Sequence, residues 1–269
     1  MQFLLIIAAY ILVQASAGSV FSSSCPLDAN VSCSSSDREP SCCFESPGGV
    51  LVQTQFWNYS PSDGPPNLFT LHGLWSDLCD GSHKEYCGYS SMIPNDANYI
   101  RNILVLQFHN ETFYNNLKNV WRNVRGTDQS LWAHEWNKHG TCINTIAANC
   151  YPEFEDNKNF YDYLTISYNL YMRLPTYKWL AAADITPSKF IRYTKAQIQD
   201  ALSSNFGQQV YFRCDSNNAI SEVWYFHHIQ GSLLQNKFIP IDTLSSSNCP
   251  SENIMFLPKT VRRMYGRYR

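Results

Sequence analysis

The sequence predicts an α+β fold in which a central antiparallel sheet packs against several helices. Segments rich in β-branched and aromatic residues are separated from the segments with helical periodicity. This segregation favours an antiparallel sheet, because a doubly wound sheet needs strands and helices that strictly alternate. Ten cysteines in 269 residues further indicate a fold stapled by disulfide bonds.

Composition predicts two strands and two loops in the first part of the chain. Residues 51–57 and 69–75 have the apolar, β-branched character of strands. Residues 58–67, which contain three prolines and one glycine, are predicted to form a loop between them. A second loop, bounded by cysteines, covers residues 76–87.

Helices are predicted in the middle of the chain. Asn95 is the expected N-cap of the first, whose apolar stripe includes Ile100, Ile103, Leu104 and Phe108. A short helix is expected over residues 131–139, and a longer one from about 155 to 173 that ends near Pro175. The tyrosines of the longer helix are expected to pack on the sheet.

The last part of the chain is predicted to return to the sheet. Thr194 and Gln197 form a capping-box pattern that opens a helix, and Gly207 is placed to close it. Strands follow at residues 210–213, 220–229 and 237–241. The sequence shows no internal repeat and no low-complexity linker, so we expect one domain.

The N-terminus is predicted to be a signal peptide. Residues 3–13 form an unbroken apolar run whose helix would cover about 16 Å, half of a bilayer core. Residues 15–17, Ala-Ser-Ala, supply a small-residue cleavage site. We therefore expect a signal peptide over residues 1–17 and a single domain over residues 18–269, with a basic tail at residues 259–269 that is solvated. The protein would be secreted or vacuolar, without stable membrane association.

A secretory route makes oxidised cysteines the default. The even number of cysteines allows five bridges, whose pairing spacing alone leaves open. A zinc cluster is the weaker interpretation, because no C-x-x-C pair occurs. Three sequons, at Asn30, Asn58 and Asn110, predict glycosylation.

The near balance of positive and negative residues bears on which macromolecules the protein could bind. Lys and Arg number 20 against 22 Asp and Glu, a formal net charge of −2. A near-neutral chain argues against tight, sequence-blind binding of duplex nucleic acid, which needs a basic surface. The composition also excludes collagen, a coiled coil and a protein with many membrane spans.

The densest group of reactive side chains lies in the segment from His134 to His139. On a helix, Lys138, Glu135 and His139 lie at about 40°, 100° and 140° from His134, so all four share one broad face. The spacing is H-E-x-x-x-H rather than the H-E-x-x-H of zinc proteases. Two histidines about 140° apart are poorly placed to bind one ion, which argues against a zinc hydrolase.

A second candidate segment surrounds His72 on a predicted strand. Gly73 beside it would let a ligand approach the backbone closely. Two histidines can act as base and acid, while further cationic groups suit a phosphoryl transition state. RNA carries its own nucleophile, the 2′-hydroxyl, so such a site needs neither a metal, a cofactor nor a covalent intermediate.

These segments carry a family resemblance. FTLHGLWSD and LWAHEWNKHGTC resemble the two active-site segments of the ribonuclease T2 family, and TQFW at 54–57 and SEVWYF at 221–226 resemble its fungal branch. The resemblance implies cleavage of single-stranded RNA through a 2′,3′-cyclic phosphate at mildly acidic pH, by a monomer. By motif position it implies roles for five residues. His139 would be the base, His72 the acid, His134 a phosphate-binding residue, and Glu135 and Lys138 would stabilise the transition state.

The resemblance also implies a base-binding site and a disulfide pattern. Trp75, Asp77 and His83 correspond to one base site, and Gln55 to a second. His83 stands where relatives often have tyrosine, and residues 121–128 depart from the usual second-site sequence, which favours low base specificity. The implied bridges are Cys25–Cys43, Cys33–Cys79, Cys42–Cys150, Cys87–Cys142 and Cys214–Cys249. A catalytically idle RNA-binding or storage relative is the alternative, against which the five intact catalytic residues argue.

Overall fold

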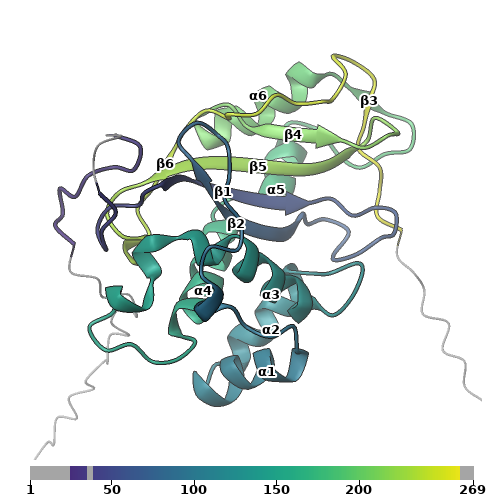
Figure 1. Ribbon diagram of the computed structural model, residues 1–269. Coiled ribbons are helices and arrows are strands. Elements are labelled where there is room, and N and C mark those ends of the chain that lie inside the picture. The colour runs from purple at the N-terminus through teal and green to yellow at the C-terminus, as the bar shows by residue number, and fades with distance from the viewer. Residues whose placement is uncertain (1–24, 35–38, 261–269) are drawn as a thin grey trace, which may run out of the picture.

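The computed structural model describes residues 25–34 and 39–260, and it confirms the α+β class. Five strands form an antiparallel sheet in the order β2-β1-β5-β4, with β6 paired to β5 (Figure 1). The strands are β1 (Gly48–Phe56), β2 (Thr70–Leu78), β4 (Tyr211–Cys214), β5 (Ile220–Ile229) and β6 (Phe238–Pro240). Two short strands, β3 (Arg192–Tyr193) and β7 (Ile254–Met255), form a separate antiparallel pair.

The helices pack around this sheet. They are α1 (Ala97–Asn102), α2 (Glu111–Val120), α3 (Asp128–Lys138), α4 (Lys158–Met172), α5 (Thr176–Ala182) and α6 (Lys195–Phe206). Figure 1 shows α1, α2 and α3 grouped beyond β2, whereas α5 and α6 lie beside the strands of the last part of the chain. Strand β2 is therefore a sheet edge covered by α3, which packs directly against it.

Local sequence signals account for several helix ends. The capping box is present, since Thr194 accepts the Gln197 amide hydrogen and the Gln197 side chain accepts the Thr194 amide hydrogen. Gly207 ends α6 with a φ of 88°, in the left-handed region where glycine is favoured. The prediction for Asn95 was wrong by one residue, because the Asp96 carboxylate caps α1.

Other boundaries also differ from the prediction. Helix α3 begins at Asp128 rather than at residue 131, because Thr127 accepts the Ser130 amide hydrogen as N-cap. After α1 the chain continues as a π-helix over Ile103–Gln107. Helices α2 and α5 were not predicted. The side chain of Asn110, the first residue of a sequon, caps α2 by accepting the Phe113 amide hydrogen.

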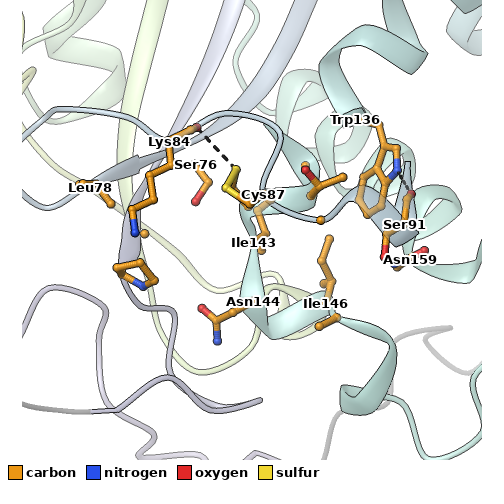
Figure 2. Close-up of a pocket in the computed structure, with 17 residues that line it drawn as sticks. Ser76, Leu78, Lys84, Cys87, Ser91, Trp136, Ile143, Asn144, Ile146 and Asn159 are labelled. Atoms are coloured by element: carbon orange, nitrogen blue, oxygen red, sulfur yellow. Dashed lines mark hydrogen bonds between the residues drawn. A yellow bond between two sulfur atoms is a disulfide. The ribbon is translucent and has the colours of Figure 1, made fainter. Parts of the chain in front are cut away.

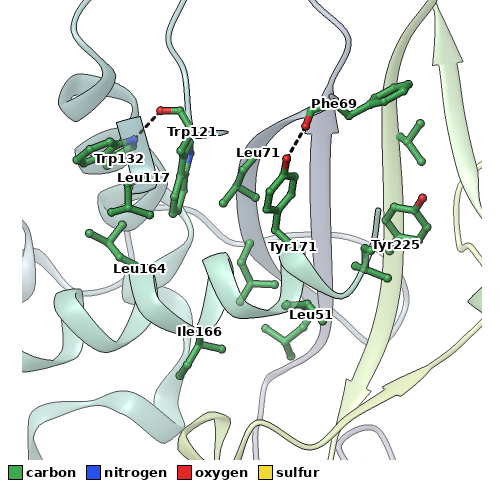
Figure 3. Close-up of a cluster of buried hydrophobic side chains, with 14 of the residues drawn as sticks. Leu51, Phe69, Leu71, Leu117, Trp121, Trp132, Leu164, Ile166, Tyr171 and Tyr225 are labelled. Atoms are coloured by element: carbon green, nitrogen blue, oxygen red, sulfur yellow. Dashed lines mark hydrogen bonds between the residues drawn. The ribbon is translucent and has the colours of Figure 1, made fainter. Parts of the chain in front are cut away.

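The main core lies between the sheet and the helices. Figure 3 shows Leu117 of α2 next to Leu164 of α4, with Trp121 between this pair and Leu71 of β2; the three leucines are fully buried. Two polar groups inside this core are satisfied by the backbone: the Tyr171 hydroxyl donates to the Phe69 carbonyl at 2.7 Å, and Trp132 Nε1 donates to the Trp121 carbonyl at 2.9 Å. The prediction that the tyrosines of α4 pack on the sheet holds for Tyr163 and Tyr171, whereas Tyr161 and Tyr168 pack on Phe113 of α2.

All five implied disulfide bonds are present. They are Cys25–Cys43, Cys33–Cys79, Cys42–Cys150, Cys87–Cys142 and Cys214–Cys249. The Cys87–Cys142 bridge ties the loop after β2 to the turn after α3, so it links the chain just beyond the two elements that carry candidate catalytic residues.

The predictions for the two ends of the chain can be tested only in part. The predicted signal peptide and residues 261–269 lie outside the described residues. Lys259 was expected in a solvated tail, but it is 6 % exposed and its ammonium donates to the Leu68 carbonyl.

Glycosylation stays a prediction: Asn30 is exposed, the Asn58 amide nitrogen is buried, and the Asn110 amide nitrogen donates to Tyr161. Among the described residues, no helix is long and apolar enough to cross a bilayer.

Candidate active site

His72 lies at an irregularity in strand β2. The pairing of β1 with β2 shifts register between Thr54 and Gln55, opposite His72. A shift of this kind re-aims side chains, and it lets His72 point out of the sheet. The Phe56 ring stacks on the imidazole at 3.8 Å between centroids, and Trp121 Nε1 donates to the His72 carbonyl at 2.7 Å. The His72 ring is therefore held by β1, and its backbone is held by the chain after α2.

Glu135 of α3 is buried beside His72. Its Oε1 lies 3.2 Å from His72 Nε2, and its Oε2 accepts a hydrogen bond from Trp75 Nε1 at 2.8 Å. Burial opposes ionisation of this carboxyl group. The neighbouring His72 and the Trp75 hydrogen bond nonetheless hold the pKa of Glu135 below its ordinary value. Glu135 is therefore a buried, oriented carboxylate.

Gly73 permits this approach of Glu135 to the strand. A Cβ atom at Gly73 would lie 2.8 Å from the Glu135 carboxyl carbon and closer still to Oε2. The expectation was that the missing side chain admits a ligand to the backbone. The structure shows instead that it admits the carboxylate of α3.

His139 follows directly after α3, as its C-cap residue. Its ring stacks on Trp75 with centroids 5.0 Å apart and planes at 22°, and the residue is 5 % exposed. Burial lowers the pKa of His139 to about 4 against the opposing charge of Glu135, and the charges of Lys138, His72 and His134 lower it further. The imidazole is therefore neutral over most of the mildly acidic range.

Lys138 is paired with an acid that the sequence analysis missed. Its ammonium lies 3.0 Å from Glu85 Oε1, which is also 3.4 Å from His83 Nε2. The Lys138 hydrogen bond lowers the pKa of Glu85 below its ordinary value. Glu85 comes from the loop after β2, so only the folded chain brings it to the end of α3.

His134 is the outlying member of the predicted group. It lies one turn before Lys138 on α3 and is exposed, whereas Glu135 and His139 are buried. It still acts on His139 through its charge. The helical geometry therefore brings the four ionisable residues to one side of α3, but at different depths.

A cavity of about 340 Å³ lies beside this cluster. It is bounded by Trp75 and Asp77 of β2, by Lys138 and His139 at the end of α3, and by His83. Burial raises the pKa of Asp77 to about 7, an effect that His83 partly opposes. Three of the four predicted base-site residues therefore line one cavity. Trp224 of β5 completes its wall, with its ring 5.0 Å from that of Trp75.

Gln55 does not line this cavity, and its role at a second base site stays a prediction. Phe56 contacts His72, so its neighbour on the strand points to the opposite, helix-covered face of the sheet. Gln55 is 1 % exposed, donates to the Leu174 carbonyl and accepts a hydrogen bond from Thr176. Gln55 is therefore buried and hydrogen-bonded within the fold.

A second cavity, of about 350 Å³, lies on the other face of β2 (Figure 2). Ser76 and Leu78 line it, together with Ile143, Ile146 and Trp136. Side chains alternate along a strand, so Trp75 and Asp77 face one cavity while Ser76 and Leu78 face the other. The described lining of this second cavity includes none of the predicted catalytic or base-binding residues.

The polar atoms of the cluster suit a ligand. Among the described residues, His72 Nδ1, Glu135 Oε1 and His139 Nδ1 are buried without a hydrogen-bond partner. Unsatisfied buried polar atoms are costly and tend to mark functional sites. Within the same described part of the chain, no group of three or more His, Cys, Asp or Glu side chains is placed to hold a metal ion.

Sequence reasoning missed several residues that contact the catalytic candidates. Phe56 and Trp121 hold His72, Glu85 pairs with Lys138, and Glu222 and Trp224 face the site from β5. Two signals were available, since Phe56 lies in the TQFW segment and Glu222 and Trp224 lie in SEVWYF. Those segments were used for the family resemblance alone.

Comparison with known proteins identifies the family. The model of the Ribonuclease T2 family matches residues 48–249. "Ribonuclease T2-like 1-A" of Candida albicans is 50 % identical over 240 residues, which is 89 % of this chain but 60 % of that protein. The chain thus spans about three fifths of the length of this relative.

"Ribonuclease T2" of Aspergillus oryzae is 42 % identical, over 92 % of this chain and 88 % of the length of that protein. The crystal structure of Actibind, a T2 ribonuclease, superposes with a TM-score of 0.82 at 40 % identity, covering 87 % of this chain and 98 % of its own. The chain belongs to the Ribonuclease T2 family.

Proposed function

We propose that this protein is a metal-independent endoribonuclease that cleaves single-stranded RNA. Transesterification would give a 2′,3′-cyclic phosphate, which a slower hydrolysis converts to a 3′-phosphate. The observation that carries the proposal is the convergence of His72, Glu135 and His139 around Trp75, next to a cavity of about 340 Å³. Family membership and the ribonuclease names of the relatives support the same reaction.

His139 is the proposed base of the first step. A base must be unprotonated, and burial keeps the imidazole neutral above a pKa of about 4. It takes the proton of the 2′-hydroxyl, whose oxygen then attacks phosphorus. Because the nucleophile belongs to the RNA, the protein supplies only proton transfer and charge.

His72 is the proposed acid, which protonates the leaving 5′-oxygen as the bond between phosphorus and that oxygen breaks. In the hydrolysis step the same residue acts as the base toward water. Each acid or base contributes about 10²–10⁴ in rate. His134 binds the phosphate, and Lys138 and Glu135 stabilise the transition state. Glu135 also orients His72.

The base upstream of the scissile bond is proposed to occupy the cavity beside Trp75. Trp75 offers an aromatic ring for stacking, which is worth about 1–3 kcal/mol for any base. Asp77 and His83 supply polar contacts at its wall. Since stacking is independent of base identity and His83 replaces a common tyrosine, we propose low base specificity.

The proposed location is an oxidising compartment, outside the cell or in a vacuole. Five disulfide bonds persist where thiols are not kept reduced. The pKa of Asp77, at about 7, makes that carboxyl largely neutral at the acidic pH of a vacuole. A neutral carboxyl group can donate a hydrogen bond as well as accept one.

The test uses purified protein, EDTA and the dinucleotide ApG at pH about 5, with its 2′-deoxy analogue and the His139→Phe variant as controls. We expect mass spectrometry to detect a 2′,3′-cyclic phosphate from the ribose substrate alone, and no product with His139→Phe. A fully active His139→Phe variant would overturn the proposed base. No cleavage of ApG or of longer RNA by the wild-type protein would favour an RNA-binding role instead, and loss of activity in EDTA would point to a metal.

A further inference from the structure

Glu222 of β5 and Glu135 of α3 lie at different nitrogens of the His72 ring. Its Oε1 lies 3.7 Å from His72 Nδ1, while Glu135 Oε1 lies 3.2 Å from Nε2. The two carboxylates come from opposite directions, one from the sheet and one from α3. Among the described residues, His72 Nδ1 is buried without a hydrogen-bond partner, and the Glu222 carboxylate lies within ion-pair distance of it.

The sheet holds Glu222 in place. In the register of the strands it pairs with Phe56 of β1 and with Arg213 of β4. Cross-strand partners project to the same face, so Glu222 shares a face with the ring that stacks on His72. Arg213 lies 3.6 Å from Glu222 Oε2, and Trp224 Nε1 donates to the same oxygen at 3.2 Å. Oε2 is thus anchored, which leaves Oε1 to face the imidazole.

We propose that Glu222 is a positioning residue for His72, holding a proton on Nδ1 so that Nε2 is the nitrogen that delivers a proton to the leaving group. This inference rests on the proposed function, in which His72 is the general acid. A carboxylate behind a catalytic imidazole fixes its tautomer and orientation and stabilises its protonated form. The side chains of His72 and Glu222 are 17 % and 13 % exposed, so water screens the pair only in part.

The proton balance follows from this arrangement. The 2′-hydroxyl gives its proton to His139 as its oxygen forms a bond to phosphorus. The bond from phosphorus to the 5′-oxygen breaks, and the His72 Nε2 proton passes to that 5′-oxygen. His72 is left neutral, with its remaining proton on Nδ1 facing Glu222. For hydrolysis, the bare Nε2 can then accept a proton from water.

Several charged groups lie around His72, and all of them influence how activity depends on pH. Glu135 and His139 face it from α3, Glu222 faces it from β5, and Arg213 of β4 acts through its contact with Glu222. Replacing Glu222 by glutamine removes one negative charge and keeps the shape. We expect the pH at which activity declines on the alkaline side to fall by about one unit.

The decisive comparison uses two substrates. Cleavage of ApG needs a proton on the leaving oxygen, whereas a nucleoside 3′-(4-nitrophenyl phosphate) releases a stable phenolate that needs none. We expect Glu222→Gln to lower kcat on ApG about tenfold and to leave kcat on the aryl ester within about twofold. Glu222→Asp is expected to recover part of the loss. Glu252→Gln, an exposed residue with the same charge change, is the matched control.

The outcomes separate the two proposals. Equal losses on both substrates, or an unchanged alkaline limb of the pH profile, would overturn the positioning role even if activity falls. A thermal melt of Glu222→Gln, followed by circular dichroism, is expected to match that of Glu252→Gln; a much lower Tm would assign Glu222 a structural role. If the wild-type protein cleaves neither substrate, the proposed function itself fails.

Discussion

Gly73→Ala is expected to disable the site with a single methyl group. The new Cβ would lie 2.8 Å from the Glu135 carboxyl carbon and 3.1 Å from its Cγ. Carbon atoms in contact prefer about 3.5–4.0 Å, so the Glu135 side chain must retreat by about 1 Å. The retreat is costly because Glu135 is 1 % exposed and bonded to Trp75 Nε1.

Two consequences follow, of different size. Displacing a catalytic group by about 1 Å can lower the rate about 10²-fold, since the reacting groups lose their alignment. Overpacking a buried contact costs about 1–3 kcal/mol of the free energy of unfolding, which a chain with five disulfide bonds can absorb. We therefore expect a folded protein with about one hundredth of the wild-type activity.

The assay measures kcat/KM on ApG together with thermal unfolding by circular dichroism. Gly88→Ala is the control, because its Cβ would meet Thr141 at an ordinary 3.4 Å and its φ of −122° suits alanine. We expect Gly88→Ala to retain at least half of the wild-type activity. A folded Gly73→Ala protein with activity close to wild type would refute the argument that the Glu135 position matters.

Two further predictions concern the charges of the site. Because burial lowers the pKa of His139 to about 4, the base is neutral above that pH and protonated below it, so we expect kcat/KM to fall as pH drops through about 4. Initial rates from pH 3 to 7 test this, and an acid limb near pH 6.5 would contradict it. Glu85→Gln removes the carboxylate that pairs with Lys138, so we expect a lower KM for RNA with kcat little changed, and a larger effect at low salt. A raised KM in steady-state assays would show that Glu85 assists binding instead.

Local patterns were sufficient to predict much of the fold. Strands β1, β2 and β5 were predicted with their ends within a few residues, because their apolar runs are bounded by loops. The capping box of α6 was correct, since it depends on residues three apart. Helix α5 was missed because it is short and tertiary packing stabilises it more than its own propensity.

At the candidate site, predictions succeeded where the relevant geometry is local and failed where it is not. The helical angle placed Glu135, Lys138 and His139 on one side of α3, as found. It could not show that Glu135 is buried and His134 exposed, which depends on where β2 lies. The TQFW motif could not show that the alternation of β1 turns Gln55 to the face away from His72.

The sequence by itself determined the residue types, the motif spacing and the family resemblance, and with that resemblance the five disulfide pairs. Only the tertiary structure decided which side chains meet across the chain: Glu85 at Lys138, and Trp121 and Glu222 at His72. The physical reason is that electrostatic and packing interactions depend on distance in space and on exclusion of water. Both are set by how the edge strand β2 packs on α3 and beside β1 and β5, which no local pattern encodes.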